Sequence, residues 1–198
     1  TMHKIHISDR RGSHWKIKTI AQEVSAATYQ FNEFKTSKRK SSGFNKLTFL
    51  VDDASERKTM SLAFKEASGL TQGINLTKNL ANRPANICTP THLAEVSLSL
   101  AESNSNLTTQ VLEEIDMEKL KMGALLSVSK GSRQPAKFII IKYDAENPIQ
   151  MKPVVLVGKG VTFDSGGISL KSGPGMDEMK YDMGGAASVI GSMLAVAI

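Results

Sequence analysis

The chain has 198 residues, of which 40% are hydrophobic and 22% charged, a composition typical of a globular protein. No apolar run reaches the roughly 18 residues that a helix needs to cross a bilayer, which argues against a membrane-spanning protein. The single cysteine, Cys88, excludes an intrachain disulfide framework and fits a reducing compartment, so we expect a cytoplasmic location. We expect Cys88 itself to be buried and structural rather than a reactive thiol.

The positive charge is concentrated near the N-terminal end. The net charge is +6, and residues 1–50 hold ten Lys and Arg against three Asp and Glu, a local net charge of +7. Arg10, Arg11 and the run KTSKRK at 35–40 carry most of it. Such a patch can attract nucleic acid, although no aromatic residues interleave with it to stack on bases. A solvated loop is the plainer interpretation, and both stay open.

The first part of the chain predicts helices around one short strand. Residues 16–34 place apolar side chains at helical spacing, and KLTFLV at 46–51 has the pattern of a strand. A long helix follows, capped by Asp52 or Asp53 and ending before Pro84. Because it leads into a segment of Pro and Asn, we interpret it as a connector between two domains.

Strands and helices alternate in the remainder. We expect a helix to start at Pro90 with Thr89 as its N-cap. Strands are predicted at 107–113, 124–131, 137–144 and 153–160, a short helix closed by Gly123 at 115–123, and a buried apolar helix at 182–198. This order predicts an α/β fold with a mixed, largely parallel sheet flanked by helices.

The stretch VGKGVTFDSGGISLK at 157–171 places two lysines and one aspartate in a glycine-rich loop. It fails the known phosphate-binding patterns, because Pro153 occupies the first glycine position of a Walker A loop and Phe163 the third of a dinucleotide fingerprint. It supplies no G-x-S-x-G elbow for a serine nucleophile. The four histidines and one cysteine form no zinc motif. A metal site remains, beside the plainer interpretation of surface Lys–Asp pairs in a turn.

Acidic residues gather around this loop. Asp164 follows the end of a predicted strand, where α/β sheets present ligands, and Asp177, Glu178 and Asp182 lie within one further loop. Asp182 precedes the last helix, whose dipole favours an ionised carboxylate. Carboxylates that face one pocket repel each other unless a cation lies between them. Lysine is an uncommon ligand, because a divalent ion must first displace its proton.

Four segments of the sequence resemble the leucyl (cytosol) aminopeptidase family, whose members are two-metal peptidases. They are NLANRPANICTPTHLAE, MEKLKMGALLSVSKGSRQPAKFIIIKYD, GKGVTFDSGGISLK and MDEMKYDMGGAASV. The resemblance implies the end of a smaller N-terminal α/β domain at 1–53, a connecting helix at 54–84, and the first part of a catalytic domain at 85–198. It also implies a cytoplasmic homohexamer that acts on peptides.

The resemblance further implies roles for five residues. Lys159 would be an amine ligand of one metal, Asp164 would bridge both metals, and Asp182 would bind the same metal as Lys159 and hold the substrate's amino group. Lys171 would be the catalytic lysine that donates to the scissile carbonyl oxygen, and Met179 would line the pocket for the N-terminal side chain. The two divalent ions would be zinc or manganese, with magnesium or cobalt as alternatives, and bicarbonate would take part in the complete site.

The implied activity is release of N-terminal amino acids, leucine-like ones preferred, by attack of a metal-activated water. The family places a further Asp/Glu pair and an arginine in a later segment that this sequence does not contain. We therefore expect the chain to lack the start of the N-terminal domain and the later part of the catalytic domain, and to be inactive alone. The alternative is a DNA-binding, regulatory or assembly role of the basic N-terminal part without catalysis.

Overall fold

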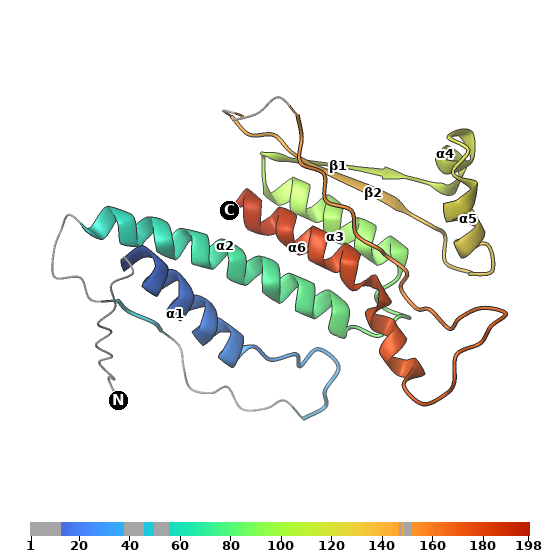
Figure 1. The fold of residues 1–198 in the computed structure, drawn as a ribbon, viewed down its shortest axis with the longest axis horizontal. Helices are drawn as coiled ribbons and strands as arrows, with labels where there is room; N and C mark the ends of the chain where they lie inside the picture. Colours follow the sequence, from blue (N-terminus) through green and yellow to red (C-terminus); the bar gives the residue numbers. More distant parts are fainter. Residues whose placement is uncertain (1–12, 38–45, 50–55, 147, 149–151) are drawn as a thin grey trace. The chain divides into compact units, whose positions relative to one another are not determined.

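The computed structural model describes residues 13–37, 46–49, 56–146, 148 and 152–198. Figure 1 shows the helices and strands in chain order. The chain groups into two compact units, residues 1–71 with Ile198, and residues 72–197, and we describe each unit by itself. The three-part division into domains expected from the sequence stays a prediction. No helix within the described ranges is long and apolar enough to cross a lipid bilayer.

The first unit is built on two helices, α1 (Ser13–Thr28) and the first part of α2 (Glu56–Asn82). Ile17 of α1 and Ala63 and Ala67 of α2 are buried. Lys18 of α1 donates to Glu66 of α2 at 2.9 Å, which links the two helices.

Two expectations for this first unit differ from the structure, one at the end of a helix and one in a predicted strand. The first helix stops at Thr28 instead of residue 34, where the Thr28 hydroxyl donates back to the Val24 carbonyl at 2.9 Å. Beyond this helix, the ring centroids of Phe31 and Phe34 lie 5.9 Å apart. Residues 46–49 form no strand, because β-branched and aromatic residues favour a strand only where a neighbouring strand pairs with them. Residues 50 and 51 of the predicted strand lie outside the described part of the chain.

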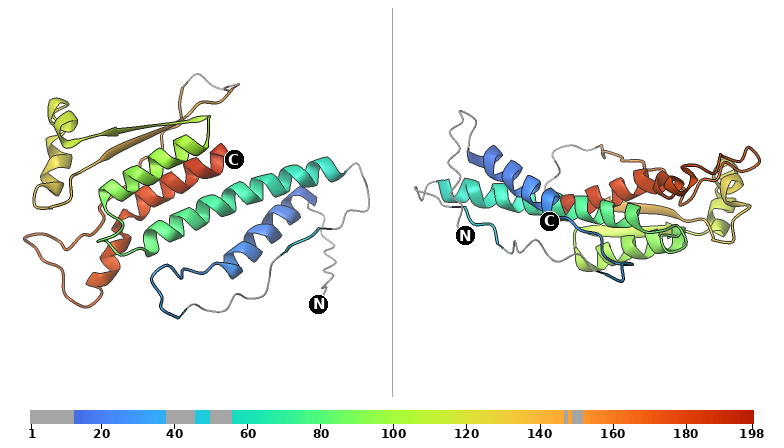
Figure 2. Two further views of the ribbon diagram at one scale, coloured as in Figure 1. Left: turned by 180° about the vertical axis from the view of Figure 1, so that it is seen from behind. Right: turned by 90° about the horizontal axis from the view of Figure 1, so that it is seen from below.

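The second unit contains a two-stranded sheet covered on one face by helices. Strands β1 (Leu107–Leu112) and β2 (Phe138–Tyr143) pair with Leu107 opposite Tyr143 and Leu112 opposite Phe138. Helices α3 (Pro90–Ser103) and α6 (Gly184–Ala197) lie side by side against this sheet (Figures 1 and 2). The predicted α/β class is confirmed. The pairing of β1 with β2 is antiparallel, within what we expected to be a mixed, largely parallel sheet.

Two predicted strands are absent at their expected positions. Residues 124–131 belong instead to helix α5 (Gly123–Ser129) and the turn after it, following the short helix α4 (Glu114–Lys119), so Gly123 begins a helix rather than closing one. The Ala, Leu and Ser residues there accept a helix readily, and periodicity alone does not separate the two states in so short a run.

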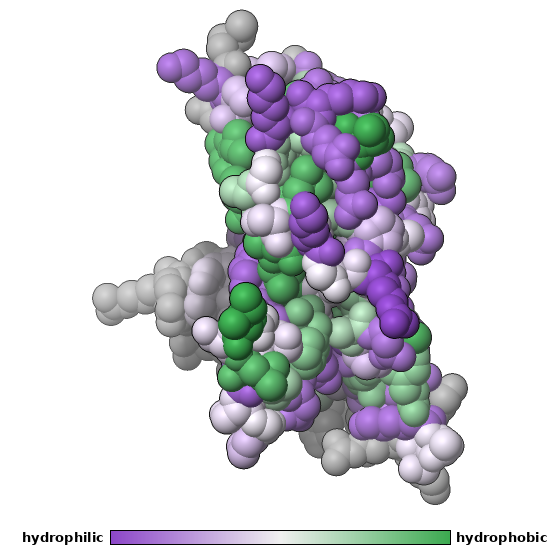
Figure 3. Space-filling view, turned by 90° about the vertical axis from the view of Figure 1, so that its right-hand side faces the viewer, coloured by the Kyte–Doolittle hydropathy of each residue, from purple (hydrophilic) through white to green (hydrophobic). Residues whose placement is uncertain are grey.

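The segment 153–160 has the composition of a strand but forms no ladder with the described residues. Its β-branched side chains are exposed, with Val154 at 75% and Val157 at 91% of their full exposure. Figure 3 shows that exposed hydrophobic residues, in green, occur among the polar residues on one face of the molecule. A strand needs a neighbouring strand for its N–H and C=O groups, and no strand among the described residues pairs with this segment.

The helix boundaries that local signals set agree with the sequence. The hydroxyl oxygen of Thr89 accepts a bond from the His92 amide at 3.2 Å, and Pro90 is the first residue of α3. The helix α2 ends at Asn82, before Pro84. Both features were predicted, because a capping hydroxyl and a proline act on the residues next to them.

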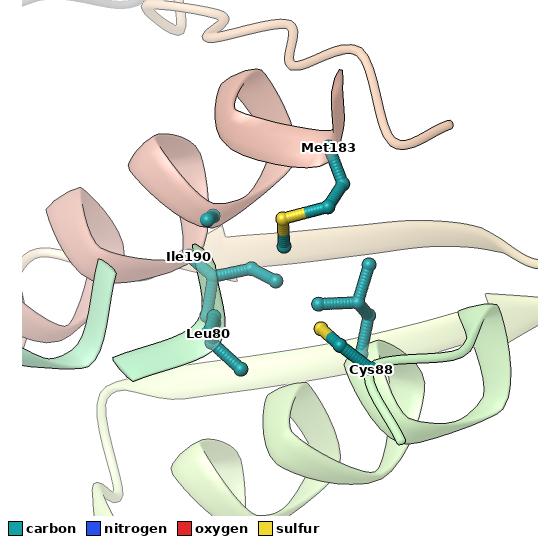
Figure 4. Packing of buried hydrophobic residues seen from close by; sticks show 6 residues of the cluster. Leu80, Cys88, Met183 and Ile190 are labelled. Atoms are coloured by element: carbon teal, nitrogen blue, oxygen red, sulfur yellow. The ribbon is translucent and has the colours of Figure 1, made fainter. Parts of the chain in front are cut away.

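The core of the second unit lies between α2, α3 and α6. Among the described residues, six buried ones form a cluster there, namely Leu80, Cys88, Leu93, Met183, Ala187 and Ile190. Figure 4 shows Leu80, Cys88, Met183 and Ile190 pointing toward one another. Cys88 is buried as expected, and burial raises the pKa of its thiol. Met183 ends the 3₁₀ helix η1 (Met176–Met183), so the core anchors the chain directly after Asp182.

Helices α2 and α6 approach each other to backbone contact. A Cβ placed on Gly73 would lie 2.3 Å from the carbonyl oxygen of Gly191. The Thr77 hydroxyl donates across the same interface to the Ala187 carbonyl at 3.1 Å. Because these positions leave no room for larger side chains, the small residues fix how closely α6 packs on α2.

Candidate metal and catalytic site

The glycine-rich loop folds back on itself at Asp164. The backbone N–H of Gly166 donates to Asp164 Oδ1 at 2.9 Å, and the Lys171 N–H donates to the Ser165 carbonyl at 2.9 Å. Gly166 has a φ of 93°, and a Cβ there would lie 2.4 Å from the Ser169 carbonyl oxygen. Only glycine accepts that conformation without strain, so this turn brings the Lys171 backbone next to the residue that follows Asp164.

The structure brings all five predicted site residues into one run of contacts. Lys159 Nζ contacts Asp182 Oδ2 and lies 4.0 Å from Asp164 Oδ2. Lys171 Nζ lies 3.3 Å from the same Asp164 oxygen and 2.9 Å from the sulfur of Met179. Two carboxylates therefore meet one lysine from two chain segments, and the second lysine lies beside one of these carboxylates.

The electrostatics of the site keep Asp164 ionised. The pKa of its carboxyl lies below the usual value, first because the Gly166 N–H donates to it and then because of the Lys171 ammonium. The Lys159 side chain is 55% exposed and that of Asp182 is 23% exposed. Ion pairs that are exposed to solvent contribute little to stability, so this pair alone adds little to the stability of the fold.

The remaining acidic residues of this region lie apart. Asp177 and Glu178 are exposed residues in the first turn of η1. In the part of the chain that the structure describes, no group of three or more His, Cys, Asp or Glu side chains is placed to hold a metal ion.

The donors that do converge are two carboxylates, Asp164 and Asp182, and the amine of Lys159. Oxygen and nitrogen donors suit a divalent ion, which would take the place of the lysine proton between the carboxylates. These residues fit a metal as part of a coordination shell.

Sequence reasoning did not find one feature of the site. The Ala186 N–H, in the first turn of α6, donates to the Lys159 carbonyl at 2.8 Å. Gly158 and Gly185 lie in backbone contact beside that bond. The glycines are visible in the sequence, but no linear pattern states that these two distant positions meet.

Residues 75–198 match the catalytic domain of the cytosol aminopeptidase family. The chain belongs to this family. A probable cytosol aminopeptidase from Nitrosomonas eutropha is 48% identical over 188 residues, which cover 94% of this chain and 37% of that relative. One from Psychromonas ingrahamii is 44% identical over 195 residues, covering 98% of this chain and 38% of the relative.

Two solved structures have a similar fold. The bottromycin maturation enzyme BotP in complex with Mn has a TM-score of 0.72 and 28% identity, covering 96% of this chain and 38% of BotP. A tomato leucine aminopeptidase variant has a TM-score of 0.73 and 29% identity, covering 96% of this chain and 36% of that enzyme. This aminopeptidase-family chain thus spans well under half the length of the proteins it resembles, and its five candidate site residues lie within the matched 75–198 range.

Proposed function

We propose that the protein is a metal-dependent aminopeptidase that releases N-terminal amino acids from peptides, with leucine-like residues preferred. The observation that carries the proposal is the convergence of Lys159, Asp164, Asp182 and Lys171 within the part of the chain that matches the catalytic domain. Family membership supports peptide hydrolysis as the reaction class. A cytoplasmic location, a homohexamer and inactivity of the 198-residue chain by itself stay proposals.

Lys159, Asp164 and Asp182 would supply part of the donors for two divalent ions. The Mn in the BotP structure supports a divalent metal, with zinc, manganese, magnesium and cobalt as candidates. When bound, such ions lower the pKa of a bound water toward neutrality and polarise a carbonyl group. The chain's own contribution is to hold two carboxylates and an amine within reach of one point.

Lys171 would act on the substrate rather than on the metal. Its ammonium lies 3.3 Å from the Asp164 carboxylate, so it can donate a hydrogen bond to a carbonyl oxygen placed beside that carboxylate. Such a donor matters most when the oxygen gains negative charge during attack. Asp182 would accept from the free amino group of the substrate. Met179, in contact with Lys171, would line the pocket for the N-terminal side chain.

The variant Lys171→Ala tests the catalytic assignment. In the complete, active enzyme, we expect kcat for leucine p-nitroanilide in the presence of Mn²⁺ to fall by about 10²–10³, the usual loss when one oxyanion donor is removed. Lys119→Ala is the matched control, because Lys119 is 70% exposed on α4, outside the site loop, and should leave kcat unchanged. Full activity of Lys171→Ala with bound metal would overturn the role of Lys171.

The structure does not describe most of the basic residues on which the alternative function of the N-terminal part depends. Arg10, Arg11 and residues 38–40 of the basic run lie outside the described residues. Nucleic-acid binding therefore stays the open alternative stated from the sequence.

A further inference from the structure

The backbone of Lys159 is tied to the start of α6. The Lys159 carbonyl accepts from the Ala186 N–H at 2.8 Å. The first four N–H groups of a helix have no partner inside that helix and must be satisfied from outside. The loop that carries one candidate ligand thus satisfies a donor in the first turn of the helix that follows the other candidate ligand, Asp182.

Two glycines make this connection possible. A Cβ on Gly158 would lie 2.4 Å from the Gly185 carbonyl oxygen. A Cβ on Gly185 would lie 2.7 Å from the Lys159 nitrogen and 3.2 Å from the Lys159 carbonyl oxygen. The atoms that would be struck belong to the backbone, so no side chain can rotate away to make room.

The contact fixes two parts of the site relative to each other. Asp182 precedes α6 by two positions, and Met183 between them has 0% exposure in the core. The lysine side chain that reaches Asp182 is more than half exposed, so the ion pair alone holds the two weakly. The separation of the Lys159 backbone from the Asp182 backbone is therefore set by packed main-chain atoms.

We propose that Gly158 and Gly185 are positioning residues of the metal site. Their backbone contact, together with the bond from Ala186 to Lys159, sets the distance between Lys159 and Asp182 at which both reach one divalent ion. The inference rests on the proposed function, because it gives a role to residues around the same site.

The size of the expected disturbance follows from the geometry. Ordinary van der Waals contact of a Cβ begins at 3.4 Å, so an alanine at 185 must move the Lys159 backbone nitrogen, and with it the base of the ligand side chain, by roughly 0.7 Å from its 2.7 Å position. Metal–ligand distances hold to within about 0.2 Å. A displacement of this size exceeds that tolerance, and loss of a supporting contact around a metal ligand lowers affinity by about 10–100-fold.

The experiment compares Gly185→Ala with Gly184→Ala in the native polypeptide. Gly184 is the adjacent residue of the same helix, has a φ of −57°, and has no atom within 4 Å of the place that a Cβ would take. Both variants add one methyl group at the start of α6. The readout is the dissociation constant of Mn²⁺ alone, measured by the electron paramagnetic resonance signal of free Mn²⁺. We expect an increase of at least about tenfold for Gly185→Ala and less than about twofold for Gly184→Ala.

Each result decides the matter. Equal Mn²⁺ affinity of Gly185→Ala and the unsubstituted protein overturns the positioning role, even if the melting temperature falls. Absence of Mn²⁺ binding by the unsubstituted protein overturns the proposed metal site itself, and the inference with it.

If Gly185→Ala loses its far-UV circular dichroism, Gly158→Ala replaces it as the test. Gly158 lies outside any helix, and a Cβ placed on it would strike the Gly185 backbone from the loop side of the same contact. It should weaken Mn²⁺ binding by about tenfold with α6 intact, and unchanged binding would overturn the proposal.

Discussion

Replacing Leu80 with alanine tests whether the cluster in Figure 4 stabilises the unit that carries the site. Leu80 is 0% exposed and belongs to one cluster with Cys88, Met183 and Ile190. Each buried methylene group is worth about 0.8 kcal/mol, and the cavity left behind adds to that loss, so buried Leu→Ala changes cost about 2–5 kcal/mol. Because Leu80 is fully enclosed, we expect the free energy of unfolding to fall by about 3–4 kcal/mol.

Cys88 provides a readout inside the same cluster. It is the chain's single cysteine and is 1% exposed, so a thiol reagent can label it only when this core opens. Since about 1.4 kcal/mol corresponds to a factor of ten, the Leu80→Ala variant should be labelled about 10²–10³ times faster than the unsubstituted protein. Labelling at about 25 °C, with a parallel urea titration followed by circular dichroism, measures both quantities.

The control is Leu62→Ala, the same substitution on the same helix at a residue that is 54% exposed. Surface substitutions usually change stability by no more than about 0.5 kcal/mol, so labelling should change by less than about threefold. Equal labelling rates for the Leu80→Ala and Leu62→Ala variants would refute the packing described for Leu80. A lower urea midpoint with unchanged labelling of Cys88 would show that Leu80 and Cys88 do not share one core.

Two further predictions concern local contacts. The Lys18 hydrogen bond lowers the pKa of Glu66 below its ordinary 4.5, so the stabilisation is present above that value and lost as the pH falls through the lowered pKa. Lys18→Met should raise the Glu66 pKa toward 4.5 in a carboxyl ¹³C NMR titration, and an unchanged titration would contradict the pairing. Thr89→Ala should lower the free energy of unfolding, measured in urea, by about 1 kcal/mol, whereas Thr89→Ser should keep the cap and most of the stability. Equal losses of stability for both variants would contradict capping by the hydroxyl.

The elements that follow from local chemistry were predictable from the sequence. Thr89 followed by Pro90 marks a helix start, Pro84 ends the preceding helix, and the runs at 107–112 and 138–143 are strands as expected. The errors occur where a short run suits two states. Residues 124–129 combine Leu, Val and Ala with Ser, and only their surroundings decide between helix and strand.

The site shows the same division between local pattern and tertiary contact. The pattern and the family resemblance named Lys159, Asp164, Lys171, Met179 and Asp182, and the structure joins these residues through side-chain contacts. Their catalytic and metal-binding roles stay proposals. The backbone contact between the loop and α6 could not be predicted, because a pair of glycines carries no signal of which distant backbone it meets.

The exposed run at 154–157 has a consequence for the behaviour of the purified chain in solution. Its four consecutive uncharged side chains, three of them valines of high β propensity, offer a template on which another molecule can add a strand. Lys152 and Lys159 flank this run, and the repulsion between their positive charges and those of a second copy opposes strand addition, as gatekeeper residues do. Salt screens these charges, so high ionic strength favours self-association through the segment that leads into the site.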